Sequence, residues 1–429
     1  MNPLAVSITA VLLLVFLFLK VPVFISILGA CTFYFTMQTG TPVQIYAQRI
    51  CASLESTALL AIPFFITAGV LMNYSGVTRR IMDFCALITG RWAGGLAQVN
   101  VLLSTLMGGL SGSNLADAAM EAKMLVPEME KHGYSKAFST VVTAVSALIT
   151  PLIPPGIALI IYGTVAQVSI GKLFVSGLEV GVVCCVAMMI LVRRLSIKRG
   201  YVPMRTEKLS RKEFWTVTVR ALPPLALPII IIGGIRLGIF TPTEAGSVAI
   251  VYALILAVAY KEMSFKQFLR AIRESVLSTA QILVIVAAAS AFGYIITIEQ
   301  IPQNITKFIL SIIDNKYAFI FAVNIFLLIV GMFMEGIAAM LILIPLLAPV
   351  ANAFGIDPVQ FGMIVVFNMS VGTITPPLGT VMFVTCGITK CPTKDFLREC
   401  IPFYIYQLII LLIISYIPVA SLGLVNLIY

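Results

Sequence analysis

The chain has 429 residues, of which 60% are hydrophobic and 11% are charged, and its formal net charge is +10. Soluble domains are about half apolar and about a quarter charged, whereas one membrane-crossing helix needs roughly 20 mainly apolar residues. The mean hydropathy of +1.05 therefore excludes a water-soluble enzyme and predicts an all-α polytopic membrane protein.

Apolar stretches long enough to enter a membrane follow one another along the chain. The first stretch has no basic residue in front of it, and a second apolar run begins at Val21. We therefore expect a retained membrane helix there rather than a cleaved signal peptide. The candidate segments are 4–19, 21–37, 54–72, 81–90 with 95–110, 137–166, 173–192, 221–239, 243–260, 276–298, 318–348, 359–389 and 401–420.

The most basic stretch lies near the middle of the chain. It contains Arg193, Arg194, Lys198, Arg199, Arg205, Lys208, Arg211 and Lys212, interrupted by Glu207. Cytoplasmic loops of membrane proteins are enriched in Lys and Arg, so this charge indicates a cytoplasmic loop and requires no nucleic-acid partner. The sequence thus predicts a first half over 1–192, a cytoplasmic linker over 193–220 and a second half over 221–429.

The two halves repeat weakly when one is shifted by 222 positions. The shift places Pro127 on Pro349, Gly133 on Gly355, and the pair Pro154–Pro155 on Pro376–Pro377. Weak internal symmetry, with apolar segments interrupted at matching places, is typical of secondary transporters.

Each half contains one apolar segment that is too long and too broken for a plain helix. Ala137–Ala166 contains Thr150–Gly156 (TPLIPPG), and Val359–Thr389 contains Gly372–Gly379 (GTITPPLG). Proline lacks a main-chain N–H and disfavours helical geometry in the residue before it, so both segments should unwind. The alternative is a proline kink that packing or water fills.

Unwound backbone at membrane depth frees carbonyl groups, which must line a cavity or coordinate an ion. The hydroxyls of Thr150, Thr373 and Thr375 add oxygen donors. Oxygen donors without a dense carboxylate cluster suit Na⁺ better than a divalent ion. The half-helix after each break would direct its positive end toward an anion.

A second polar cluster in each half lies in the middle of a long apolar stretch. These clusters are Met107–Asn114 and Gly331–Gly336, which we interpret as the tips of re-entrant hairpins. Close helix packing by small residues is the alternative. Glu335 is flanked by long uncharged runs, and an ionisable group at membrane depth is a functional candidate. A salt bridge or a helix-end role is the alternative for Glu335.

The remaining polar residues offer little chemistry. Asp117, Glu121 and Lys123 have the spacing of charged pairs on a solvated helix surface. His132 is the only histidine, the eight cysteines form no CxxC pair, and no GxxxxGK[ST] motif occurs. A zinc site, a histidine-based triad and an ATP site are therefore not expected, and we predict no enzyme activity and no cofactor.

Four motifs together resemble the large membrane (permease) subunit of tripartite ATP-independent periplasmic (TRAP) transporters, over essentially the whole chain. The motifs are Gly108–Asn114, Thr150–Gly156, Phe240–Gly246 (FTPTEAG) and Gly372–Gly379. The resemblance implies a bacterial inner-membrane protein with two inverted repeats, re-entrant hairpins and discontinuous helices that works as an elevator. It also implies a small four-helix membrane subunit, a periplasmic substrate-binding protein, and uptake of an organic acid driven by Na⁺ rather than ATP.

The resemblance also implies site residues. The first sodium site would involve Ser111, Ser113, Asn114, Thr150, Ile153 and Gly156, and the second Gly331, Gly336, Gly372, Thr375 and Leu378. Candidates for contact with the substrate, a C4-dicarboxylate or a sialic acid, are Pro154, Pro155, Glu335, Thr373, Pro376 and Pro377. A stand-alone Na⁺/dicarboxylate symporter without partners is the alternative function.

Overall fold

The computed structural model describes residues 3–19, 21–38, 42–205 and 210–429, with only the main chain for Pro3, Leu110 and Ser111. In these residues all regular structure is helical, in 21 α-helices and two short 3₁₀ helices. Eight helices within these ranges are long and apolar enough to cross a membrane, or nine if one bent pair counts as a single span. The predicted all-α polytopic class is therefore confirmed.

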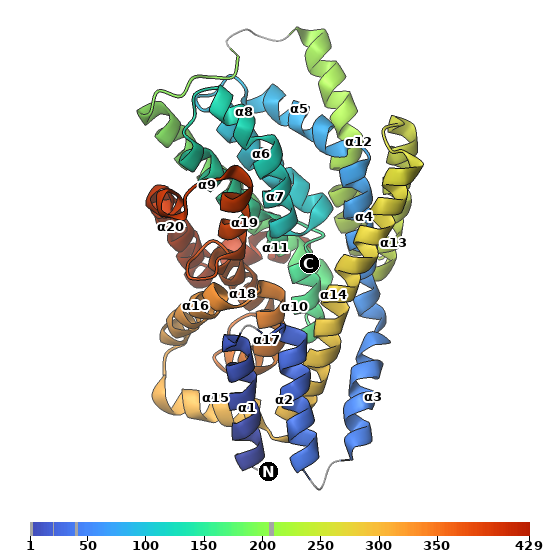
Figure 1. Cartoon of the computed structure of the whole chain (residues 1–429), viewed down its shortest axis with the longest axis vertical. Coiled ribbons are helices and arrows are strands. Elements are labelled where there is room, and N and C mark those ends of the chain that lie inside the picture. The colour runs from blue at the N-terminus through green and yellow to red at the C-terminus, as the bar shows by residue number, and fades with distance from the viewer. Residues whose placement is uncertain (1–2, 20, 39–41, 206–209) are drawn as a thin grey trace.

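Seven helices form a layer along one side of the molecule, which we call the flanking bundle (Figure 1). Within it α4 packs against α13 and α14, and α14 also packs against α2 and α3. The members are α1 (Pro3–Phe18), α2 (Val23–Met37), α3 (Val43–Leu54), α4 (Ala61–Tyr74), α12 (Arg211–Arg236), α13 (Pro242–Tyr260) and α14 (Phe265–Ile298).

A second group of helices forms the core bundle, which contains two helical hairpins and two broken helices. The hairpins are α6 (Gly95–Ser111) with α7 (Asn114–Met124), and α16 (Lys316–Phe333) with α17 (Gly336–Ala353). The broken helices are α9 (Lys136–Ser146), η2 (Ala147–Leu152) and α10 (Ile157–Val165), and α18 (Pro358–Gly372) with α19 (Thr380–Thr389). The long helices α11 (Ile170–Lys198) and α20 (Thr393–Tyr416) support them.

Five shorter helices accompany these elements, and α21 is the last element of the chain. They are η1 (Thr57–Leu60), α5 (Val77–Thr89), α8 (Val126–Lys131), α15 (Ile301–Ile312) and α21 (Val419–Ile428). The apolar segments expected from the sequence include none at α3 or α15, because Gln44, Arg49, Gln303 and Lys307 interrupt the apolar character of these helices. Apolar length alone therefore misses helices that pack with one face.

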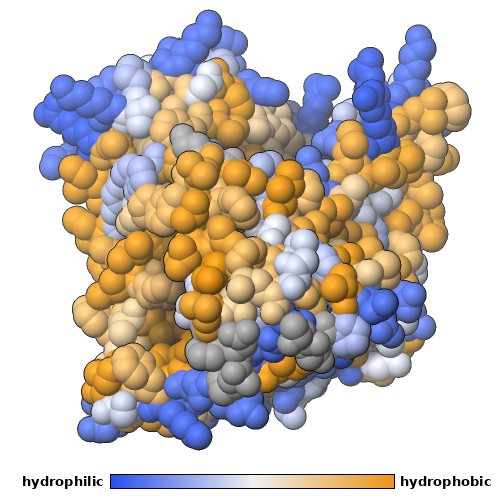
Figure 2. Space-filling view, turned by 60° about the horizontal axis from the view of Figure 1, so that its bottom comes forward, coloured by the Kyte–Doolittle hydropathy of each residue, from blue (hydrophilic) through white to orange (hydrophobic). Residues whose placement is uncertain are grey.

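The face of the molecule seen in Figure 2 carries a broad apolar band between hydrophilic ends. Large apolar side chains are exposed on the flanking bundle, among them Ile229, Val258 and Val276, at 74%, 75% and 61%. Such exposure is unfavourable in water and is expected where a helix faces lipid.

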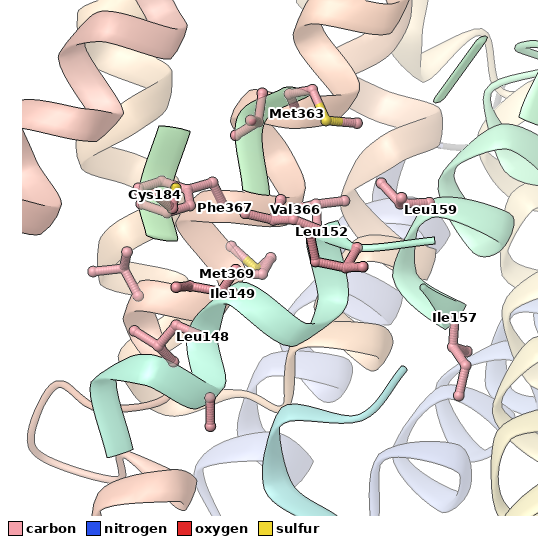
Figure 3. Close-up of a cluster of buried hydrophobic side chains, with 14 of the residues drawn as sticks. Leu148, Ile149, Leu152, Ile157, Leu159, Cys184, Met363, Val366, Phe367 and Met369 are labelled. Carbon is pink, nitrogen blue, oxygen red and sulfur yellow. The ribbon is translucent and has the colours of Figure 1, made fainter. Parts of the chain in front are cut away.

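Inside the core bundle the two broken helices pack against each other (Figure 3). Leu148, Ile149 and Leu152 of η2 lie beside Val366 and Phe367 of α18, and all five are buried. Because lipid is as apolar as these side chains, van der Waals packing rather than transfer from water holds the two helices together.

Capping boxes fix where three helices of the flanking bundle begin, at Ser210 for α12, Thr241 for α13 and Ser264 for α14. Ser210 caps α12 by accepting from the Glu213 N–H, and the Glu213 carboxylate accepts from the Ser210 N–H. Thr241 and Glu244 do the same at α13, so part of the FTPTEAG motif has a structural role. Within the predicted linker 193–220, the described residues 193–198 continue α11 and residues 211–220 already belong to α12.

Candidate functional site

The first broken helix unwinds at the predicted motif. The chain passes from η2 through an extended Ile153 and the cis Pro154–Pro155 bond, and α10 begins at Ile157 with a bend of 42° between the two helical parts. A Cβ on Gly156 would overlap the carbonyl oxygen of Pro151, so this turn needs glycine. The predicted interruption is confirmed.

The second broken helix is interrupted at the corresponding place. Helix α18 ends at Gly372, a cis Pro376–Pro377 bond follows, and α19 begins at Thr380. The carbonyl oxygen of Thr373 accepts hydrogen bonds from the N–H groups of Val381 and Met382, at 2.9 and 3.3 Å. The loop is thus closed by main-chain bonds across the break.

The tip of the first hairpin lies against the first loop. Gly112, in the left-handed region at φ +63°, turns the chain between α6 and α7, and Ser113 caps α7 by accepting from the Ala116 N–H. A Cβ on Gly112 would stand 3.1 Å from the carbonyl oxygen of Pro155. A Cβ on Gly108 would likewise stand 3.0 Å from the carbonyl oxygen of Thr150. These approaches bring the residues of the first predicted sodium site into one neighbourhood; the side chain of Ser111 lies outside the described part of the structure.

The second hairpin makes the equivalent approach. A Cβ on Gly372 would stand 2.5 Å from Cα of Gly331, and the N–H of Leu378 donates to the carbonyl oxygen of Met332 at 3.2 Å. The Thr375 hydroxyl donates to the Val371 carbonyl oxygen at 2.9 Å. The residues of the second predicted sodium site therefore also lie around one hairpin–loop contact.

The two halves meet at the centre of the core bundle. The Asn114 side-chain amide, at the tip of the first hairpin, donates to the hydroxyl of Thr373 in the second broken helix at 3.3 Å. Glu335 caps α17 by accepting from the Ala338 N–H at 3.0 Å. The helix-end alternative for Glu335 is therefore realised, and its carboxylate also lines the cavity described next.

A cavity of about 530 Å³ lies between the core bundle and the flanking bundle. Its lining includes Ser113, Asn114, Glu335, Gly336 and Thr373 from the predicted sites. Helices α4 and α14 supply the opposite wall. Among the described residues that line it, the charged ones are Glu274 and Glu335, both acidic.

The proline pairs proposed to contact substrate have different surroundings. Pro154 and Pro155 are buried, whereas Pro376, Pro377 and Leu378 are exposed. Neither pair is among the residues that line the cavity, although Pro151 is.

Two acids that sequence reasoning placed on a solvated surface are buried beside the first loop. Asp117 and Glu121 are 1% and 0% exposed. The Thr150 hydroxyl donates to Asp117 Oδ2 at 3.0 Å, and the Ser104 hydroxyl donates to Glu121 Oε2 at 2.6 Å. The expectation of surface pairs is wrong because α7 packs into the core bundle against η2, α9 and α19. Alanines beside both acids, at 118 and 122, were the only local sign of that packing.

An asparagine links each hairpin to its broken helix. Asn100 of α6 accepts from the hydroxyl of Ser146 in α9 at 3.1 Å. In the second half, Asn368 of α18 donates to the side-chain oxygen of Asn324 in α16 at 2.8 Å. Ser146 and Asn368 are themselves 222 positions apart, so the weak repeat in sequence coincides here with an equivalent hairpin contact.

Comparison with known proteins identifies the family. The model of the tripartite ATP-independent periplasmic transporter, DctM component, matches residues 10–420. The sialic acid TRAP transporter large permease protein SiaM of Vibrio cholerae is 37% identical over 403 residues, 94% of each chain. The C4-dicarboxylate TRAP transporter large permease protein DctM of Pseudomonas aeruginosa is 37% identical over 391 residues, 90% of each chain.

A solved structure shares the fold at low sequence identity. The YdaH transporter of Alcanivorax borkumensis is 12% identical, with a TM-score of 0.58 over 90% of this chain and 89% of that one. This likeness concerns the fold alone. On the family match and the two relatives, this multi-pass membrane protein belongs to the DctM-component family of TRAP transporters, a family of transporters and not of enzymes.

Proposed function

We propose that this chain is the permease subunit of a Na⁺-coupled importer of organic acids in a bacterial inner membrane. The relatives described above are named for sialic acid and for C4-dicarboxylates, both of which carry carboxylates. The family description as tripartite and periplasmic supports two partners, a small membrane subunit and a periplasmic substrate-binding protein. The apolar band on the surface also requires a lipid bilayer around the protein.

The meeting of Asn114, Thr373 and Glu335 on one cavity is the observation that carries this proposal. Small-molecule sites are typically cavities of about 300–1,000 Å³ with a few convergent polar groups. Such a cavity between two helix bundles, with both hairpins reaching it, suits a ligand that is received from one side and released to the other.

The charge of the cavity supports coupling to a cation. An organic anion that enters a space whose described charged lining is Glu274 and Glu335 meets repulsion. Na⁺ held by loop oxygens would supply the missing positive charge. We assign the first ion to Ser113, Asn114, Thr150, Ile153 and Gly156, with Ser111, and the second to Gly331, Gly336, Gly372, Thr375 and Leu378.

We further propose that the core bundle moves against the flanking bundle as an elevator. The two repeats over 1–192 and 221–429 would each supply one hairpin and one broken helix to the moving part. The basic linker over 193–220 would lie in the cytoplasm. If Na⁺ and the organic acid both favour the same loop geometry, binding of one would strengthen binding of the other.

Uptake by reconstituted protein tests the proposal. The chain and its small partner subunit would be placed in proteoliposomes and given labelled sialic acid and succinate, with and without an inward Na⁺ gradient and the binding protein. We expect uptake only when both are present. Uptake that needs Na⁺ but no binding protein would instead support the stand-alone symporter, which the family match does not favour. Absence of uptake under every condition contradicts an organic-acid importer.

A further inference from the structure

The cavity wall that the flanking bundle supplies combines apolar and polar side chains, and most of its polar side chains come from α14. Glu274, Ser278 and Gln281 of α14 line the cavity and are four and three residues apart, which places them on one helix face. Between and beside them, Val276, Leu277 and Val284 are exposed at 61%, 55% and 41% and do not line it. Glu274, Ser278 and Gln281 thus present one polar stripe of α14 to the cavity.

Asn73 of α4 extends this polar wall. Its side-chain oxygen is buried and has no hydrogen-bond partner among the described residues. Buried amide groups in folded proteins are nearly always hydrogen-bonded, so rotation of the Asn73 side chain would offer an amide without a competing partner to a ligand in the cavity. Ser278, which the shift of 222 pairs with Ser56, adds a hydroxyl to the same wall.

Among the described residues of this wall, Glu274 is the one that is charged. Its Oε2 accepts a hydrogen bond from the Tyr74 hydroxyl at 3.0 Å, which holds the carboxylate beside α4. A second carboxylate on a ligand that reached this wall would meet like charge, and the described lining offers no Lys or Arg to receive it.

We infer that this wall selects the uncharged polar tail of a hydroxylated monocarboxylic acid and disfavours C4-dicarboxylates. The inference rests on the proposed function and narrows its substrate class. Asn73, Ser278 and Gln281 provide neutral donors and acceptors for hydroxyl or amide groups, while Glu274 repels a second carboxylate. A site that hydrogen-bonds a ligand hydroxyl discriminates strongly against ligands without it, because its polar groups are then left unpaired.

Direct binding to the complex of both membrane subunits tests the inference without the selectivity of the binding protein. Dissociation constants for sialic acid, gluconate and succinate would be measured by titration in saturating Na⁺. We expect at least one of the two hydroxylated acids to bind tenfold or more tightly than succinate. Tighter binding of succinate, or no binding of any acid by a complex that still shows Na⁺-driven uptake, would overturn the inference.

Two substitutions assign the selectivity to the wall. Gln281→Leu should weaken binding of the preferred hydroxylated acid fivefold or more and leave succinate unchanged. Glu274→Gln, which can still accept from Tyr74, should tighten succinate threefold or more. Thr297→Val is the matched control, since its hydroxyl lies on α14 away from the cavity and donates to Gly293.

The half-saturating Na⁺ concentration distinguishes a local effect from general damage. It should stay within twofold of the unsubstituted protein in all three variants. If both wall variants keep the original ratio of affinities for the hydroxylated acid and succinate, the wall does not determine substrate selectivity. The proposed organic-acid import would still stand. If the unsubstituted complex transports no acid, the proposed function fails, and this inference fails with it.

Discussion

At the scale of single side chains, Thr150 joins the first loop to a buried acid. Thr150→Val keeps the shape of the side chain and removes the hydroxyl that donates to Asp117. Loss of a hydrogen bond to a buried charged group costs about 1–3 kcal/mol, so the purified protein should unfold at lower temperature. The apparent Na⁺ affinity should fall severalfold in uptake assays, because the same oxygen is assigned to the ion.

Thr164→Val is the control for this prediction. The Thr164 hydroxyl donates to the carbonyl oxygen of Ile160 within α10 and is not part of the assigned sodium sites. Thr150→Ser should restore both properties. Equal behaviour of Thr150→Val and Thr164→Val would remove Thr150 from the ion site.

Asn114 and Thr375 belong to different assigned ion sites. Asn114→Ala deletes the amide that donates to Thr373, and Thr375→Ala deletes the hydroxyl that donates to the Val371 carbonyl oxygen. We expect each variant to insert into the membrane normally and to need several times more Na⁺ for half-maximal uptake. Na⁺ titration of uptake measures this, and an unchanged titration curve in both variants would contradict the assignment.

At this scale the sequence predicts residues that act locally and misses those that act through packing. Proline and glycine set their own backbone, so Pro154, Pro155 and Gly372 could be placed at the breaks from their chemistry alone. Asp117 and Glu121 have the spacing of a solvated pair, and only the position of α7 inside the core bundle shows that they are buried. Asn73 and Gln281 carry no local signal, because the cavity that gathers them joins helices distant in sequence.

At the scale of elements, α16 and α18 touch where two glycines meet. Gly372→Ala would place a Cβ 2.5 Å from main-chain atoms of Gly331, and neither helix has a flexible side chain there to move aside. Overpacking of this kind costs about 1–3 kcal/mol. We expect a lower unfolding temperature and a loss of most Na⁺-driven uptake, because the second hairpin is displaced from its loop.

Gly387→Ala gives this prediction a matched control. Gly387 lies inside α19, and a Cβ there would meet nothing within 4 Å. Alanine favours a helix interior over glycine by about 0.5–1 kcal/mol, so this variant should be unchanged or more stable. Similar thermal unfolding of the two variants would show that the Gly331–Gly372 contact tolerates extra volume.

Element boundaries were predictable where an apolar run ends at proline or glycine, and less so where a helix is amphipathic. The interruptions within 137–166 and 359–389 are confirmed. Helix α15 is amphipathic, with apolar residues on one face and polar residues on the other. A criterion of continuous hydrophobicity therefore misses it. The 81–90 run proved to be part of α5, whose Arg79, Arg80 and Asp83 lie among its apolar residues.

At the scale of the whole molecule, the end of α11 and the start of α12, which flank the middle of the basic linker, lie at the opposite end from the α15–α16 connection (Figure 1). Cysteines at Val202 and Asp314, both exposed, should therefore react from opposite sides of the membrane. With the exposed Cys51 replaced by serine, a membrane-impermeant maleimide should label Val202→Cys only in inside-out vesicles. It should label Asp314→Cys only in spheroplasts.

The reverse pattern would invert the proposed topology and place the linker in the periplasm. Labelling of both positions from one side would contradict the arrangement in Figure 1 itself. The positive-inside rule predicts the side from charge alone. The separation of the two ends follows from how the helices are arranged in three dimensions.

The two proline loops, alike in sequence, differ in exposure: Pro154 and Pro155 are buried, and Pro376 and Pro377 are exposed. A small cation that reaches the enclosed loop has to shed its hydration shell almost completely, while one at the outer loop can keep part of it. Dehydration governs how quickly such an ion arrives and departs. Ions at the two loops would then exchange at different rates. The outer loop would exchange its ion quickly with the surrounding salt, and the inner loop would keep its ion through a transport cycle.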